Sequence, residues 1–394
     1  MNDFIIFYSI FDNHNDHMIP FNKPYLTGDE SKMIELAFKK GKFSGNGYFT
    51  KKCHSFIQER FGFDKCLLTN SATSAIEMAT ILCDIKEGDE VIIPSYTFVA
   101  SATPFALRKA KLVFCDSEKS SPNINVDEIE RLITHKTKVL LVVHYAGQAC
   151  DMDRINALAE QYKLFIIEDA AHSITSKYKN QFLGSFGHLA VFSFHETKNI
   201  SCGQGGMLVI NDQSMIERAE VIWAKGTNRL AMEKGEVPIY EWQDLGSNFY
   251  PSEITAAFLY AQLQYLDEIQ DRRKLLWEKY RDNLLHLASS DTFLLPEIKN
   301  YQENNYHIFY LVCRSNEERN DLISYLNQNE ILAVFHYLPL HKSPYIKSIS
   351  GGLIHLKNAE YFSDNLIRLP LFAALAIDQV DYITSHIVKF YKNR

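Results

Sequence analysis

An acidic pair follows one of the most apolar runs of the sequence. The run Leu164–Ile167 leads directly into Glu168 and Asp169. A carboxylate buried at the end of a strand needs a cationic partner, because its ionised form is otherwise costly. The protonated nitrogen of a pyridine ring is one such partner. A helix cap or a metal ligand would also explain an aspartate here, so the pair alone leaves these alternatives open.

A lysine lies 198 − 169 = 29 residues further along, again just after an apolar run. Lys198 follows Ser193-Phe194 and precedes the glycine cluster Gly203-Gln204-Gly205-Gly206. Glycines let the backbone turn sharply and return to a sheet. A lysine held in such a cleft with a depressed pKa can form a Schiff base with a carbonyl compound. The alternative is an ordinary solvated surface charge.

Small polar residues occupy a third junction, Asn70–Ala75, between an apolar run and a helical pattern. The first N–H groups of a helix and the positive end of its dipole form an anion site suited to a phosphate. A simple Ser or Thr helix cap is the alternative. The segment is not a Walker loop, because it lacks the Gly-Lys-Ser/Thr signature.

Alternating strands and helices are expected to position Asp169, Lys198 and the segment Asn70–Ala75. From Met18 onward, short apolar runs alternate with amphipathic stretches, which indicates βαβ units and a mostly parallel sheet covered on both faces. The expected strands are Lys65–Thr69, Glu90–Pro94, Lys111–Cys115, Lys138–Val143, Leu164–Asp169, His188–Phe194 and Gly206–Ile210. The expected helices include Ser74–Cys83, Val126–Thr134 and Met152–Gln161. Ligands of such α/β sheets lie beyond the carboxyl ends of the strands, where all three groups occur.

The pattern changes near Phe249–Pro251. We expect residues 18–250 to form a large domain, and residues 251–394 to form one long helix and a smaller α+β domain. The elements expected there are a helix over Ser252–Leu285, a strand over Tyr306–Cys313, a helix over Glu318–Asn327 and the apolar run Ile331–Leu338. Residues 1–17 are an extension of unknown role, whose apolar run lacks the basic flank and cleavage site of a signal peptide.

The order of a phosphate cradle, an aspartate and then a lysine resembles pyridoxal-phosphate enzymes of the aspartate-aminotransferase fold, also called fold type I. The chain is most similar to the sugar aminotransferase family. The motifs that carry the resemblance are Pro94-Ser95-Tyr96-Thr97-Phe98, Glu168-Asp169-Ala170-Ala171-His172, Ser193-Phe194-His195-x-x-Lys198 and Gly205-Gly206. The resemblance runs from about Met18 to the C-terminus.

This resemblance implies a role for several residues around a bound pyridoxal 5′-phosphate. Lys198 would hold the cofactor covalently and then move a proton during catalysis, and Asp169 would keep the pyridine nitrogen protonated. His172 would hydrogen-bond the 3-oxygen of the ring, and Phe98 would stack on the ring unless it is a plain core aromatic. The phosphate would be held by Ala72, Thr73 and Ser193.

The resemblance also implies a homodimer with shared active sites, because Asn248 matches an asparagine that relatives contribute from the neighbouring subunit. Two departures are notable: Ser247-Asn248-Phe249 stands where tyrosine-asparagine-tyrosine is usual, and Gln204 replaces a glutamate.

On the sugar side of the pocket, His336 and Tyr337 resemble a lining segment of relatives. His195 is either a substrate contact or a packing residue. A zinc site at His336 and His341 is disfavoured, because no third ligand motif accompanies them.

The expected reaction moves the amino group of L-glutamate to the C4 ketone of dTDP-4-dehydro-6-deoxyglucose, for the synthesis of a surface glycan. Other keto sugars remain open, whether aminated at C3 or linked to GDP or UDP, as does a non-catalytic protein of the same fold that binds nucleotide sugars or regulates. A related 3-dehydratase is disfavoured, because those relatives have histidine where this chain has Lys198.

Composition narrows the class of protein. The 394 residues carry 41 Lys+Arg against 48 Asp+Glu, and the net charge of 41 − 48 = −7 argues against a nucleic-acid or anionic-membrane partner. No run approaches the ~20 uncharged apolar residues of a membrane span. The seven cysteines form no C-x-x-C pair, which favours reduced thiols in a cytoplasmic protein.

Overall fold

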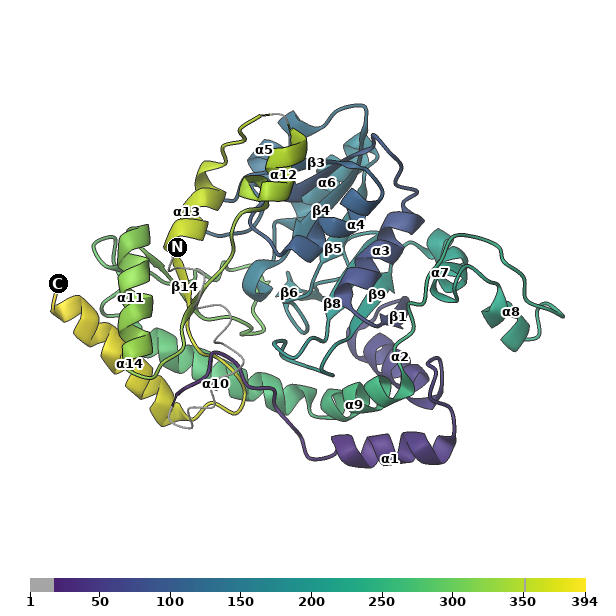
Figure 1. The fold of residues 1–394 in the computed structure, drawn as a ribbon, viewed down its shortest axis with the longest axis horizontal. Coiled ribbons are helices and arrows are strands. Elements are labelled where there is room, and N and C mark those ends of the chain that lie inside the picture. Colours follow the sequence, from purple (N-terminus) through teal and green to yellow (C-terminus); the bar gives the residue numbers. More distant parts are fainter. Residues whose placement is uncertain (1–17, 351) are drawn as a thin grey trace.

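A computed structural model describes residues 18–350 and 352–394 of the chain. The predicted extension, residues 1–17, lies outside the described residues. Figure 1 shows a central sheet wrapped by helices, with α9 and α10 running beneath it and α11 and α14 on the side of the C-terminus. A segment that carries α8 (Arg229–Glu233) projects from the opposite side.

The central sheet has seven strands in the order β1-β9-β8-β5-β4-β2-β3. Only β9 runs against its neighbours, so the predicted mostly parallel sheet is confirmed. Its strands are buried almost throughout, as expected for a sheet covered on both faces. The strands are β1 (Lys65–Thr69), β2 (Glu90–Pro94), β3 (Lys111–Cys115), β4 (Thr137–Val143), β5 (Phe165–Asp169), β8 (Leu189–Ser193) and β9 (Gly206–Ile210).

Successive side chains of the strands enter different cores, because they alternate across the sheet. Along β1, Leu67 packs into one apolar cluster, whereas Cys66 and Leu68 pack into another. The helices of this part of the chain are α1 (Glu30–Lys40), α2 (Tyr48–Phe61), α3 (Ala72–Leu82), α4 (Thr103–Leu107), α5 (Val126–Leu132), α6 (Met152–Tyr162) and α7 (Ile216–Trp223). The two-sided cover therefore follows from apolar strands that need partners on both faces.

The prediction of a single long helix over Ser252–Leu285 is wrong. The segment forms two helices, α9 (Glu253–Gln264) and α10 (Leu266–Leu284), which meet at Tyr265, where φ is −109° and ψ is 19°. Helix α9 packs on α1 and α2, whereas α10 packs on α14 (Ile377–Lys392). Because the two halves serve different partners, packing rather than a Gly or Pro breaks the helix.

A second, antiparallel sheet has the order β10-β12-β14-β13. Its strands are β10 (Phe293–Leu294), β12 (Tyr310–Cys313), β13 (Val334–Phe335) and β14 (Leu366–Arg368). Helices α11 (Asn316–Gln328), α12 (Pro344–Ser350) and α13 (Lys357–Asn365) belong to the same region. The strand predicted from Tyr306 begins only at Tyr310, and Tyr306 itself has a left-handed φ of 56°, which a strand does not accommodate. The division of the chain at residue 250 into two domains stays a prediction.

Three short strands form a third sheet in the order β11-β6-β7. They are β6 (Lys177–Tyr178), β7 (Gln181–Phe182) and β11 (Gln302–Glu303).

Two further properties concern the cysteines and the hydrophobicity of the helices. All seven cysteines are free, and every one except the half-buried Cys202 is buried. Over residues 18–350 and 352–394, no helix has the length and apolar character that crossing a membrane requires.

Candidate active site

The N-terminus of α3 forms a cradle of unpaired N–H groups. Ser71 caps the helix by accepting a hydrogen bond from the Ser74 N–H at 3.1 Å. Among the described residues no acceptor pairs with the N–H groups of Ala72 and Thr73. Both residues are half-buried, so an anion can reach these groups. The arrangement is suited to a phosphate.

Strand β9 brings Ser193 to this cradle. Gly206 of β9 is paired with Thr69 on one side and with Ser193 on the other. A Cβ atom on Gly206 would lie 2.3 Å from the backbone nitrogen of Ala72. Only glycine permits this close approach, which explains the second glycine of the Gly205-Gly206 motif.

Asp169 is buried at the carboxyl end of β5, with both oxygens held. The hydroxyl of Ser101 donates to Oδ2 at 2.7 Å, and the Ala171 N–H donates to Oδ1 at 3.2 Å. Ser101 also hydrogen-bonds the hydroxyl of Thr97 at 2.9 Å. These contacts fix the direction in which the carboxylate points, while no cation among the described residues forms an ion pair with it.

Lys198 lies half-buried in the loop between β8 and β9. Burial lowers its pKa from the ordinary 10.5 to about 7, because an ammonium ion is poorly solvated there. The charge of Asp169 acts in the opposite direction, and the charge of Arg368 lowers the pKa further. A large fraction of the amine is therefore neutral near pH 7, which is the form that attacks a carbonyl group.

His172 provides a neutral imidazole beside this lysine. Burial holds its pKa well below the usual range, and the charges of Lys198 and Arg368 act in the same direction. Its Nδ1 accepts a hydrogen bond from the Ala146 N–H at 3.3 Å, which assigns the proton of the neutral ring to Nε2. The Nε2–H group has no acceptor among the described residues and is available as a donor.

Of the predicted substrate-side residues, His336 lies near His172, and Tyr337 lies near Phe98. The ring of His336 is 6.4 Å from that of His172, and its Nδ1 is 3.2 Å from the Tyr145 hydroxyl. The ring of Tyr337 is 6.1 Å from that of Phe98. Phe98 is 57% exposed, so its interpretation as a plain core aromatic is wrong.

Two predicted residues lie at the outer edge of this arrangement. His195 is exposed, and its Nδ1 is 3.1 Å from the Thr197 hydroxyl. Asn248 is also exposed, and its carbonyl oxygen accepts a hydrogen bond from the Asn70 side chain at 3.1 Å. The backbone of Asn248 therefore borders the cradle of its own chain.

The structure adds residues that sequence reasoning missed. Arg368 of β14 donates from Nη1 to the ring of His336 at 3.1–3.2 Å and stacks on Phe21 at 4.6 Å. A signal was present, since Arg368 is a charged residue inside the apolar run Leu366–Pro370. For Ser101 and Tyr145 the sequence offers no comparable signal.

His341 has partners other than His336. His341 is engaged by the Ser95 hydroxyl at 2.7 Å and by Glu360 at 3.3 Å. Within the parts of the chain that the structure describes, no group of three or more His, Cys, Asp or Glu side chains could hold a metal ion.

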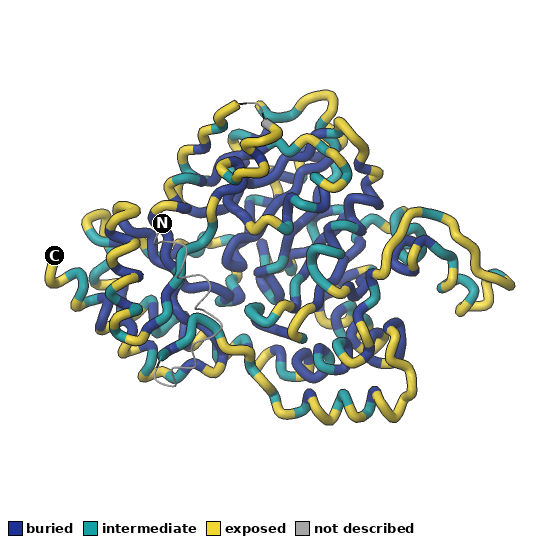
Figure 2. The backbone as a smooth tube through the Cα atoms, in the orientation of Figure 1, coloured by how far each residue is buried: buried dark blue, intermediate teal, exposed yellow. Residues whose placement is uncertain are grey.

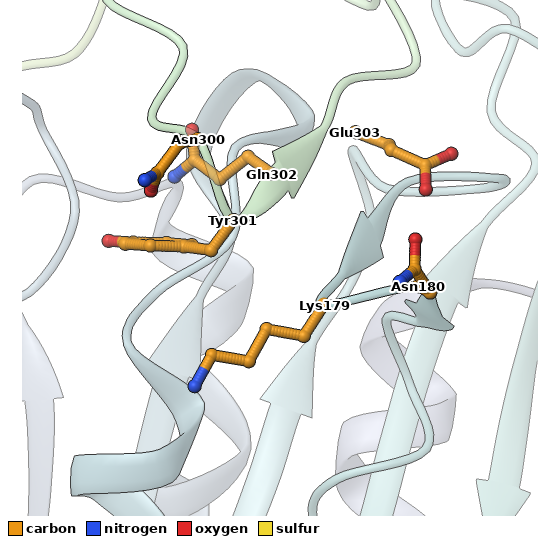
Figure 3. Close-up of a pocket in the computed structure, with 6 residues that line it drawn as sticks. All are labelled: Lys179, Asn180, Asn300, Tyr301, Gln302 and Glu303. Carbon is orange, nitrogen blue, oxygen red and sulfur yellow. The ribbon is translucent and has the colours of Figure 1, made fainter.

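A separate surface cavity of about 400 Å³ contains none of these residues. Figure 3 shows its lining, which comes from the β6–β7 turn and the segment around β11: Lys179, Asn180, Asn300, Tyr301, Gln302 and Glu303. It is therefore distinct from the candidate active site.

Comparison with known proteins decides the family. Residues 24–388 match the DegT/DnrJ/EryC1/StrS aminotransferase family. The chain belongs to this family. It is 31% identical over 383 residues to GDP-perosamine synthase of Escherichia coli O157:H7, covering 95% of this chain and 99% of that protein. It is 32% identical over 325 residues to the pleiotropic regulatory protein of Geobacillus stearothermophilus, covering 82% and 84%.

Solved structures of sugar aminotransferases are similar to this chain in fold. The PLP and PMP forms of the putative sugar aminotransferase Spr1654 from Streptococcus pneumoniae each have a TM-score of 0.88 at 26% identity, over 95% of this chain and 99% of theirs. The chain is thus a sugar aminotransferase that depends on pyridoxal 5′-phosphate, with the expected fold. The sequence-based identification of the family is confirmed.

The residues of the site fit this cofactor. The free N–H groups of Ala72 and Thr73 and the close approach of Gly206 form a phosphate cradle. Asp169 supplies a fixed carboxylate, and Lys198 supplies an amine that is partly neutral near pH 7. When bound, the cofactor supplies an electron-accepting ring and carries the amino group between two substrates.

Proposed function

We propose that the chain transfers the amino group of L-glutamate to the C4 ketone of dTDP-4-dehydro-6-deoxyglucose. The product would be dTDP-4-amino-4,6-dideoxygalactose, made in the cytoplasm for a surface glycan such as enterobacterial common antigen. Amino transfer is supported above all by the lowered pKa of Lys198, an amine on which the charge of the fixed carboxylate of Asp169 acts. The choice of sugar is supported by four stretches that resemble dTDP-4-amino-4,6-dideoxygalactose transaminase: Met18–Asn22, Phe192–Asn199, Lys225–Arg229 and Ala333–His341.

In this proposal each residue has a physical task. Lys198 would hold the cofactor covalently, and its amine, once free, would move a proton to and from the reacting carbon. The negative charge of Asp169 would keep the pyridine nitrogen protonated, and Ser101 and Ala171 hold the carboxylate oxygens in place. His172 donates from Nε2 to the ring oxygen, and the exposed face of Phe98 stacks on the ring.

Other predicted residues bind the phosphate of the cofactor and the sugar substrate. Ala72, Thr73 and Ser193 hold the phosphate of the cofactor, and His195, His336 and Tyr337 contact the sugar.

We also propose a homodimer in which Asn248 reaches the partner's cofactor. The segment leading to Asn248 exposes large apolar side chains: Ile239 at 64%, Trp242 at 79% and Leu245 at 54%. Figure 2 shows this segment projecting from the body of the molecule and exposed along much of its length. Exposed apolar side chains gathered on one segment are typical of an interface.

A GDP-linked 4-keto sugar is the second candidate substrate, because a relative that is 31% identical is named GDP-perosamine synthase. A C3-keto or UDP-linked sugar has no comparable support. A regulatory role without catalysis is suggested only by the name of the Geobacillus relative, and the lowered pKa of Lys198 favours an enzyme.

The test is a substrate panel. The purified enzyme is incubated with L-glutamate and with dTDP-, GDP- or UDP-linked 4-keto-6-deoxy sugars, and products are identified by mass spectrometry and NMR. We expect the dTDP sugar to be aminated at C4 with galacto configuration, and the Lys198→Ala variant to be inactive. Faster amination of the GDP sugar would replace the proposed substrate. Wild-type enzyme that binds the sugars without aminating any of them would favour a binding protein.

A further inference from the structure

His307 is a buried histidine that the proposed chemistry does not use. It lies just before β12, and the centre of its ring is 4.6 Å from that of His172, with the two ring planes tilted by 42°. His307 comes 307 − 172 = 135 positions after His172 in the sequence. The folding of the chain thus brings a second imidazole against a residue of the candidate active site.

The side chain of Asn199, the residue after Lys198, holds the ring of His307. Nδ1 of His307 is 2.8 Å from Oδ1 of Asn199. Nδ2 of Asn199 donates to the carbonyl oxygen of Asn305 at 2.9 Å and to Oε1 of Gln270 at 2.8 Å. A backbone carbonyl oxygen can only accept a hydrogen bond, so Nδ2 faces Asn305 and Oδ1 faces His307.

This arrangement assigns the proton of the His307 ring. Because Oδ1 of Asn199 is an acceptor, Nδ1 of His307 carries the hydrogen and donates it. Burial holds the pKa of His307 well below the usual range, and nearby cations, Lys198 and Arg273 among them, act in the same direction. The ring therefore stays neutral, and its one N–H donor is already used by Asn199.

The backbone around His307 is anchored as well. Nη2 of Arg273 donates to the carbonyl oxygen of His307 at 2.6 Å. Nδ2 of Asn305 donates to the carbonyl oxygens of His172 and Ile174 at 2.7 and 2.8 Å. The segment that carries His307 is thereby tied to the loop that carries His172, so the position of one ring relative to the other is fixed from both sides.

The ring of His172 has few restraints of its own. Its Nδ1 accepts the Ala146 N–H at 3.3 Å, which is long for a hydrogen bond. An imidazole rotates easily about its Cβ–Cγ bond, so this contact alone fixes its direction weakly. The ring of His307 at 4.6 Å lies closer to it than those of Tyr145 and His336, at 5.8 and 6.4 Å. Packing by His307 therefore limits the rotation most.

We propose that His307 is a positioning residue: packed against His172 and anchored by Asn199, it fixes the direction in which the Nε2–H group of His172 points. This inference rests on the proposed role of His172, which is to donate to the ring oxygen of the cofactor. Because such a donor must point at one atom, loss of the His307 ring should weaken the hydrogen bond although His172 itself is unchanged.

Two substitutions separate the ring of His307 from its anchor. His307→Asn keeps an N–H donor near the position of Nδ1 but loses the ring, whereas His307→Phe keeps a ring and loses the donor. The full chain is freed of cofactor and titrated with pyridoxamine 5′-phosphate, which binds without a covalent bond to Lys198. Calorimetry should show binding about tenfold weaker for His307→Asn and less than about threefold weaker for His307→Phe, as expected for one weakened hydrogen bond to a charged oxygen.

A double-mutant cycle distinguishes positioning from general packing. His172→Phe keeps a ring beside His307 but removes the donor. In that background His307→Asn should change the affinity for pyridoxamine 5′-phosphate by less than about twofold, because no donor remains to be directed. An equal loss in both backgrounds would show that His307 acts only through the fold, and would overturn the proposal.

A matched control is His386→Asn. His386 is also buried, its ring lies 4.6 Å from that of Tyr382, and its Nδ1 is 3.3 Å from the hydroxyl of Tyr325. It belongs to α14, and its substitution should leave the affinity for pyridoxamine 5′-phosphate unchanged. Thermal melting of both variants measures the stability that each loses.

The possible results separate the role of His307 from the proposals on which it rests. If His172→Phe binds pyridoxamine 5′-phosphate as wild type does, the proposed role of His172 fails, and that of His307 fails with it. If His172→Phe binds weakly but His307→Asn binds normally, only the role of His307 fails. If the two positions are coupled but wild-type enzyme aminates no nucleotide sugar, the role of His307 stands and the proposed sugar substrate fails.

Discussion

The lowered pKa of the Lys198 amine is the property on which the proposed chemistry depends most directly. It can be tested by changing the pH of a solution of the cofactor-free chain. With a pKa lowered from 10.5 to about 7, half of the amine is neutral near pH 7. A lysine of ordinary pKa would be neutral in about one molecule in 3,000, so the expected gain in reactive amine is about a thousandfold.

Competitive labelling with a limiting amount of acetic anhydride measures this gain. The extent of acetylation of each lysine is read by mass spectrometry across the pH range. Lys198 should reach its plateau just above pH 7. Lys179 is the internal reference, because its hydrogen bond to Asp153 raises its pKa above the ordinary value. Labelling of Lys198 that keeps rising to pH 10 together with Lys179 would refute the reasoning.

Two variants test what sets the pKa of Lys198, through the direction in which each shifts the labelling midpoint. Because the negative charge of Asp169 raises the pKa of Lys198, Asp169→Asn should move the labelling midpoint to lower pH. Because the positive charge of Arg368 lowers that pKa, Arg368→Gln should move the midpoint to higher pH. An unchanged midpoint in both variants would show that burial alone, without these charges, sets the pKa of Lys198.

Three further predictions concern the cofactor. Asp169→Asn should lower the amino-transfer rate by about 10²–10⁴, since it removes the charge that stabilises a protonated ring; near-normal turnover would make Asp169 a packing residue. Gly206→Ala should cost about 1–3 kcal/mol of stability and weaken cofactor binding, measured by melting and titration, because the new Cβ meets the Ala72 nitrogen at 2.3 Å. Mixing inactive Lys198→Ala with an impaired Asn248→Ala dimer should restore activity if Asn248 acts across the interface, since one site then has neither defect. With subunit exchange verified by mass, a mixture without activity would contradict the shared site.

The local sequence determined most of the central sheet. The strands predicted at Lys65–Thr69, Glu90–Pro94, Lys111–Cys115 and Gly206–Ile210 have the same bounds in the structure. A short apolar run between polar turns has few other ways to bury its side chains, so its position follows from nearby residues alone. The carboxyl ends of β1, β5 and β8 then predicted where the cradle of α3, Asp169 and Lys198, in that order, would lie.

Packing between distant segments decided the rest. The break at Tyr265 and the late start of β12 depend on which helices and turns meet there, and no local pattern records this. Arg368 lies 368 − 198 = 170 positions after Lys198 in the sequence, yet its charge acts on the lysine. The sequence by itself determined the aspartate, the lysine and the strands that end at them, because these follow from side chains a few residues apart. Only the tertiary structure decided that Arg368, which forms no ion pair with any residue that the structure describes, acts on the lysine, because that depends on how distant segments pack together.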